Sequence, residues 1–138
     1  MIDGIKVKGE WFFEYEGGRR EGPFSNFITA AGLAKIAEGI ENYSAPYLVI
    51  GDDTASGETI VETFRKAVSA VTRSGNVIRF RTQLLPGEAN GNHQKVAIYT
   101  GAADTPGTGT MFNLLKQPWS KAANTVLTVE ARITVQGV

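Results

Sequence analysis

The sequence predicts a mainly β domain of the α+β class, an antiparallel β-sandwich-like fold with one short amphipathic helix near the N-terminal third. Residues 127–135 alternate between apolar and polar side chains, which is the period of a half-buried strand. Residues 33–40 instead repeat their apolar side chains at the spacing of a helix. The 138 residues suit one domain. We expect a strand or hairpin arm over residues 1–23 and a β-domain over residues 24–138.

The N-terminal segment is rich in aromatic residues. Residues 5–16 read IKVKGEWFFEYE and stop at Gly17 and Gly18, which favours a hairpin or an edge strand whose chain returns through Phe24 and Phe27. An edge strand pairs readily with another chain. Burial in the core and a stacking platform for a ligand are the alternatives. We therefore predict oligomer contacts at Ile5, Val7, Trp11, Phe12, Phe13 and Tyr15.

One helix is predicted over residues 30–40. Leu33, Ile36, Ala37 and Ile40 lie on one side of this helix, and Thr29 is available as its N-cap. A helix this short is marginal without tertiary support. We therefore expect its apolar side to pack on a sheet.

Strands are predicted along most of the remaining chain. Residues 74–76 separate two extended segments and suit a hairpin turn. In the second segment Ile78, Phe80, Thr82 and Leu84 point to one face, which predicts that this face is buried. Further extended segments are expected over residues 46–50, 64–72, 96–100 and 111–115, the last ending before Pro118.

The stretch 84–99, LLPGEANGNHQKVAIY, is interpreted as strand, turn and strand. A proline interrupts a ladder of hydrogen bonds, glycines permit unusual dihedrals, and the acid and amide side chains bond to turn backbone. The only histidine, His93, is expected in this loop. We predict a structural turn at Pro86, Gly87, Glu88, Asn90 and Gly91.

Motifs for catalysis or cofactor binding are not recognisable. The chain has no cysteine, His93 is not accompanied by a Gly-x-Ser-x-Gly elbow, and the glycines of residues 101–109 do not form a phosphate or dinucleotide loop. We therefore predict no enzymatic activity and no catalytic, cofactor-binding or metal-binding residue. Two alternatives stay open: a weak calcium contact through Asp52, Asp53 or Asp104, and a carboxylate pair among Asp53, Glu58, Glu62 and Glu88.

Charge and hydropathy restrict the partners. Lys and Arg number 14, and Asp and Glu also number 14, so the basic excess that drives nucleic-acid binding is missing. No apolar run approaches the roughly 18 residues of a membrane helix, and the first residues do not read as a secretory signal. We expect neither a nucleic-acid partner nor a membrane span.

Short motifs follow one another in order at residues 26–37, 47–54, 62–68, 75–82, 87–91 and 127–135, with Lys121 before the last. This succession covers residues 24–136 and resembles the tail, collar and fibre-associated virion proteins of tailed bacteriophages and prophages. The resemblance implies a non-enzymatic part of a virus particle that is assembled in the bacterial cytoplasm. It also implies contacts with copies of the same chain and with other virion proteins.

Two functions are predicted. The first is a structural subunit of the tail, neck or collar, baseplate or fibre attachment, which acts by homo-oligomeric assembly. The alternative is a receptor- or carbohydrate-binding module at a fibre tip, for which a host-surface receptor would be the partner. Its stacking surface would come from Trp11, Tyr43, Tyr99 and Trp119, with polar contacts from Asp52, Asp53, Asn90 and Asn92.

Overall fold

The computed structural model describes residues 4–15, 17–26 and 28–137. Strands make up 54% and helix 11% of the chain, which confirms the predicted mainly β class. In chain order the elements are β1 (Gly4–Val7), β2 (Gly9–Glu14), β3 (Arg20–Asn26), α1 (Ala30–Tyr43), β4 (Tyr47–Gly51), β5 (Glu62–Ala67), β6 (Ala70–Ser74), β7 (Val77–Leu84), β8 (Gly91–Thr100), β9 (Thr110–Lys121) and β10 (Leu127–Gly137).

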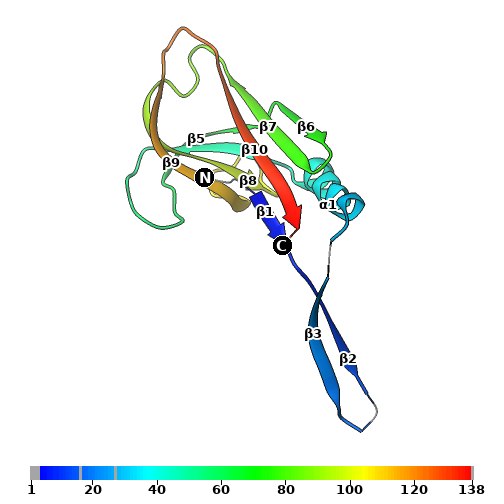
Figure 1. The fold of residues 1–138 in the computed structure, drawn as a ribbon. Coiled ribbons are helices and arrows are strands. Elements are labelled where there is room, and N and C mark those ends of the chain that lie inside the picture. Colours follow the sequence, from blue (N-terminus) through cyan, green and yellow to red (C-terminus); the bar gives the residue numbers. More distant parts are fainter. Residues whose placement is uncertain (1–3, 16, 27, 138) are drawn as a thin grey trace.

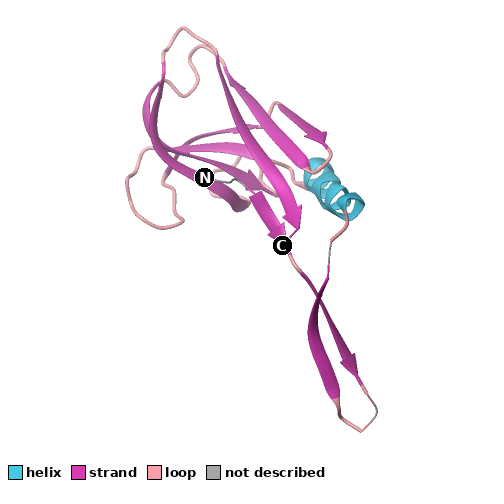
Figure 2. Ribbon diagram, in the orientation of Figure 1, coloured by secondary structure: helices cyan, strands magenta, loops and turns pink. Residues whose placement is uncertain are grey.

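Two four-stranded sheets pack against each other and form the body of the molecule (Figure 1). The first sheet has the strand order β1-β10-β7-β6, and the second has the order β5-β4-β8-β9. Neighbouring strands are antiparallel, except that β1 runs parallel to β10. Strands β2 and β3 pair only with each other and form a hairpin that extends away from the body (Figure 2). The predicted sandwich-like arrangement is confirmed.

The core lies between the two sheets and α1. As the alternation predicted, Ile78, Phe80, Thr82 and Leu84 of β7 are fully buried, whereas Arg81 is exposed. Fully burying one large apolar side chain contributes roughly 1.5–3 kcal/mol. The partners of the β7 residues in the core come from α1, from β4 and β8 of the opposite sheet, and from β10: Ala37, Leu48, Ile50, Ile98, Ile133 and Val135.

Helix α1 is longer than predicted. Thr29 is its N-cap, because the Thr29 hydroxyl accepts a hydrogen bond from the Gly32 amide at 3.0 Å. The C-terminal end lies at Tyr43 rather than residue 40. Arg73 of β6 forms an ion pair with Glu41 at 3.2 Å and so ties the added turn to the first sheet. In the described part of the chain no helix is long and apolar enough to cross a membrane.

Strand β9 does not stop before Pro118 as predicted, but continues to Lys121. Two features make this possible. Strand β9 is the last strand of its sheet, where one side needs no hydrogen-bond partner. The ladder between β8 and β9 also shifts between His93 and Lys95, so that Pro118 falls at a bulge.

Three strand-to-strand connections pass from one four-stranded sheet to the other: β5–β6, β7–β8 and β9–β10. The predicted extended segment 64–72 is divided at residues 68–69, so that β5 lies in the second sheet and β6 in the first. The stretch 84–99 does form strand, turn and strand, but its two strands β7 and β8 also belong to different sheets. By contrast, residues 75–76 form the predicted tight hairpin turn between β6 and β7, with Gly75 at φ +61°.

Candidate functional site

The hairpin β2–β3 is an arm whose base is held by the first sheet. Strand β1 pairs with residues 134–137 of β10, and the hairpin begins directly after it with Gly9 opposite Asn26. The predicted oligomer contacts are therefore divided. Ile5 and Val7 lie in β1, where Val7 packs on the core, whereas Trp11, Phe12, Phe13 and Tyr15 lie on or directly after β2.

Aromatic rings on the arm stay about half exposed. The exposed fractions are 43% for Phe12, 50% for Phe13, 44% for Tyr15 and 48% for Phe24. Phe13 and Phe24 lie 5.9 Å apart across the hairpin, and Arg20 lies 4.3 Å above the ring of Phe12. A two-stranded hairpin is at best marginally stable on its own. These rings are therefore suited to be covered by a partner.

The predicted contacts omitted Phe24, which the structure places beside Phe13. The signal was present in the sequence, because a turn at Gly17 and Gly18 brings the returning strand back along the first one. Pro23 on that strand falls within a shift of the ladder between Trp11 and Phe13, where a missing amide hydrogen is tolerated.

The arm is acidic. Residues 9–26 contain four glutamates, at positions 10, 14, 16 and 21, and two arginines, at positions 19 and 20. The difference gives the arm a net charge of −2. Arg19 lies 4.2 Å above the Tyr15 ring, so that both cations of the arm lie over aromatic rings.

His93, the other residue with possible chemistry, does not lie in a loop as predicted. It lies in β8, because β9 extends far enough to pair Trp119 with it. The side chain is 6% exposed, and its two ring nitrogens each lie 2.7 Å from an oxygen, of Asp52 and of Ala89. The Trp119 ring is 4.7 Å away. These contacts hold the 84–91 turn against the second sheet.

Lys95 organises the neighbouring loop. Its ammonium group is buried and donates hydrogen bonds to Asp53 at 2.8 Å and to the carbonyl oxygens of Ala55 and Thr59. The bond from Lys95, together with one from the Val61 amide, lowers the pKa of Asp53. All three ammonium protons therefore have an acceptor, as a buried cation requires.

Arg65 organises the loop over residues 101–109. The guanidinium forms two bonds to Glu62, at 2.6 and 2.9 Å, and donates to the carbonyl oxygens of Ala103 and Thr108. The bonds from Arg65, and one from the Gly107 amide, lower the pKa of Glu62. Because Glu62 contacts both the arginine and the loop, this ion pair fixes the loop to β5.

The predicted structural turn has the expected backbone. Gly87 and Gly91 have φ angles of +86° and +106°. Glu88 accepts a hydrogen bond from the Leu85 amide at 2.7 Å, and its ion pair with Lys66 is the main cause of its lowered pKa. Asn90 bonds instead to Lys121, and Pro86 lies just beyond the end of β7.

The residues predicted for a binding module are divided among several places, although Asp52 and Trp119 both contact His93. Trp119 packs on His93, Tyr99 lies beside Arg65, and Tyr43 ends α1. Asp104, one of the predicted calcium ligands, accepts a hydrogen bond from Tyr47 at 2.7 Å, which raises the pKa of the tyrosine. Among the described residues, no three His, Cys, Asp or Glu side chains are grouped to hold a metal ion.

The arm thus carries a cluster of half-exposed aromatic rings, whereas the charged side chains of Lys95 and Arg65 in the body hold its loops. Comparison of the chain with protein-family models, curated proteins and solved structures gave no match.

Proposed function

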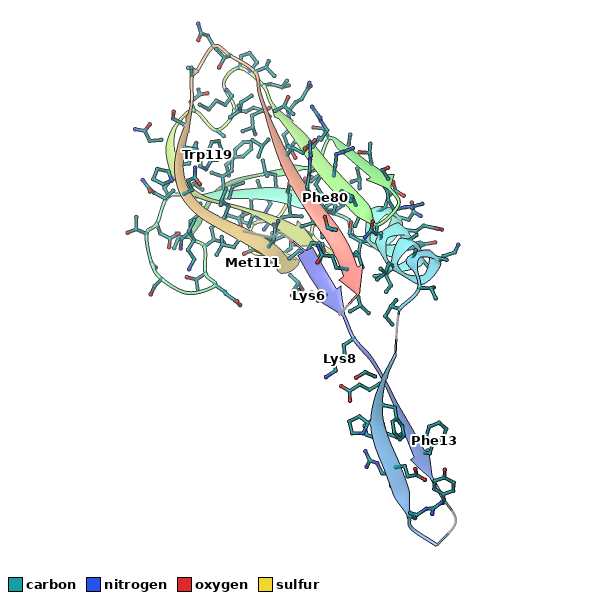
Figure 3. The ribbon with its side chains drawn as sticks, viewed as in Figure 1. Lys6, Lys8, Phe13, Phe80, Met111 and Trp119 are labelled. Atoms are coloured by element: carbon teal, nitrogen blue, oxygen red, sulfur yellow. The ribbon has the colours of Figure 1, made fainter. Side chains whose placement is uncertain are left out.

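We propose that the protein is a non-enzymatic structural subunit of a tailed-bacteriophage or prophage-like particle, in the tail, neck or collar, baseplate or fibre attachment. It acts by binding copies of itself and other virion proteins. The observation that carries this proposal is the β2–β3 arm, which extends from the body with Phe13 near its far end (Figure 3). The succession of motifs along residues 24–136 resembles virion proteins, and this resemblance supports a place in such a particle.

The arm's rings alone do not provide enough energy for stable assembly. Burying the remaining half of one ring contributes roughly 1 kcal/mol, so that four rings contribute about 4 kcal/mol. Association costs about 4–15 kcal/mol in lost freedom of motion. The surface that receives the arm must therefore add apolar contacts of its own, or backbone hydrogen bonds.

The direct test is the solution mass, measured by light scattering after size exclusion over a concentration series. The wild-type chain is expected to give a discrete multiple of its 14.8 kDa mass. Deleting residues 1–16 would also remove β1 from the body, so the informative variant replaces residues 9–26 with a short Gly-Ser linker. Gly9 and Asn26 are paired, which makes the gap short. This variant is expected to have the mass of one chain.

A matched control is Tyr43→Ser, which removes an aromatic side chain that is 86% exposed but lies on α1. It is expected to keep the wild-type mass. A wild-type protein with the mass of one chain at every concentration would contradict self-assembly. An unchanged oligomer after replacement of residues 9–26 would show that the arm is not the contact.

A further inference from the structure

The body has an apolar groove between β9 of the second sheet and β10 of the first. The groove has a volume of about 450 Å³ and is lined by residues 113–116 and 129–132, with Leu48, Val96 and Ile98 beneath them. Leu115 lies opposite Val96 in the β8–β9 ladder, so its side chain shares the inner face of the sheet. It is nevertheless 52% exposed.

Both sides of this groove are strand edges with free backbone groups. Strand β9 ends its sheet and pairs only with β8 among the described residues. Strand β10 pairs with β7 along residues 127–134, but on its other side β1 covers only residues 134–137. Residues 127–133 of β10 thus keep a row of unpaired amide and carbonyl groups in the described structure, next to apolar side chains. Such an edge accepts an added strand.

We propose that the β2–β3 arm of a second copy of this chain occupies the groove between β9 and β10. This inference rests on the proposed assembly function and identifies the surface that receives the arm. The half-exposed rings of Phe13 and Phe24, which lie together on one face of the hairpin, cover the apolar groove, and one strand of the arm extends the row that β1 begins along β10. The groove thereby supplies both the apolar contact and the backbone bonding that the arm's rings alone do not provide.

Charge favours the same pairing. The arm carries a net charge of −2. The groove residues include Lys116 and Arg132 against one acidic residue, Glu130, which gives the lining a net charge of +1. Glu130 is moreover held by Arg81 and Arg132 at 3.0 and 2.6 Å. An acidic arm therefore meets a weakly cationic groove.

The arm of the same copy does not reach this groove. Figure 3 shows Phe13 on the arm beyond Lys8, while Met111 and Trp119 of β9 lie on the body in the opposite direction. Reversing the arm would pull apart the base, where β1 is bonded to β10 and Gly9 to Asn26. The contact therefore joins two copies.

Cross-linking between singly substituted chains tests the proposal, because the natural chain has no cysteine. One preparation carries Phe13→Cys or, to keep the rings intact, Ser25→Cys on the arm. The other carries Leu115→Cys in the groove. After mixing and treatment with a short bismaleimide, the expected product is a two-chain species that contains one arm cysteine and one groove cysteine, identified by peptide mass spectrometry.

The control replaces the groove chain with Thr72→Cys, an exposed position on β6, and is expected to give only background product. If the assembly persists and both arm variants react no better with Leu115→Cys than with Thr72→Cys, the groove is not the receiving surface, while the proposed function stands. If the wild-type chain is a single copy at all concentrations, the assembly function itself is wrong and the groove proposal falls with it.

Discussion

At the scale of single residues, Gly91 shows how one position determines a connection between the two sheets. Its φ of +106° lies in the region that favours glycine, and a Cβ atom there would meet open space. The cost of Gly91→Val therefore comes from backbone strain rather than from a clash, and we expect a loss of about 1–3 kcal/mol in the free energy of unfolding. Thermal or denaturant unfolding measures it.

Gly39→Ala is the matched control for that variant. Gly39 lies inside α1, where a Cβ also meets open space, and its φ is not positive. Alanine is the better helix former, so this change is expected to stabilise by about 0.5–1 kcal/mol. A melting temperature that Gly91→Val leaves unchanged would remove the strain explanation for the turn.

Glu62 gives a prediction about pH. Hydrogen bonds from Arg65 and Gly107 lower its folded pKa below the ordinary 4.5, so the contact stabilises the fold above that pH and this contribution is lost as the pH falls through the folded pKa. At pH 7, Glu62→Gln is expected to cost about 1–3 kcal/mol, because hydrogen bonds to charged groups contribute that much. The difference from wild type should shrink below pH 4.5 in urea unfolding.

The control for this prediction is Glu58→Gln, which removes the same charge from an exposed side chain of the neighbouring loop. Its effect at pH 7 is expected to stay within about 0.5 kcal/mol, as for most surface changes. A difference between Glu62→Gln and wild type that stays constant from pH 7 to pH 3 would show that the carboxylate charge is not what holds the 101–109 loop.

At the scale of elements, the sequence predicted those whose apolar pattern is regular. The alternation in β7 and β10 and the helical spacing after Thr29 located three elements, because each buries one face against the core. The prediction failed where contacts between distant parts of the chain determine the end of an element. Strand β9 passes Pro118 because it is an edge strand with a bulge, and α1 reaches Tyr43 beside an ion pair with β6.

The candidate site was predictable only in part, for the same reason. Aromatic composition before Gly17 predicted a hairpin or an edge strand, and the structure shows Phe12, Phe13 and Tyr15 half exposed on the arm. Composition does not indicate that β1 pairs in parallel with β10 of the body. This pairing separates Ile5 and Val7 from the arm. The groove depends on where two strand edges remain unpaired, and no local pattern encodes that.

At the scale of the whole molecule, an arm that fits a groove elsewhere on the same chain makes a head-to-tail contact. Each copy then donates one arm to a second copy and accepts the arm of another copy in its groove. Repeating such a contact closes a ring when the rotation between copies allows it, and otherwise continues as an open fibre. A ring gives a mass that is stable with concentration, whereas a fibre gives a mass that grows with it.

Complementation between two defective chains distinguishes this head-to-tail contact from arm-to-arm pairing. One chain lacks the arm because residues 9–26 are replaced, and the other carries Leu115→Glu, which adds an acidic group to the groove that would meet the acidic arm. Each alone is expected to have the mass of one chain. Mixed, they should form a dimer and stop there, because the only intact arm and the only intact groove are then used.

Leu85→Glu, at another exposed leucine, is the control for added charge and should assemble normally. Pairing of the Leu115→Glu chain with itself would instead indicate arm-to-arm contact.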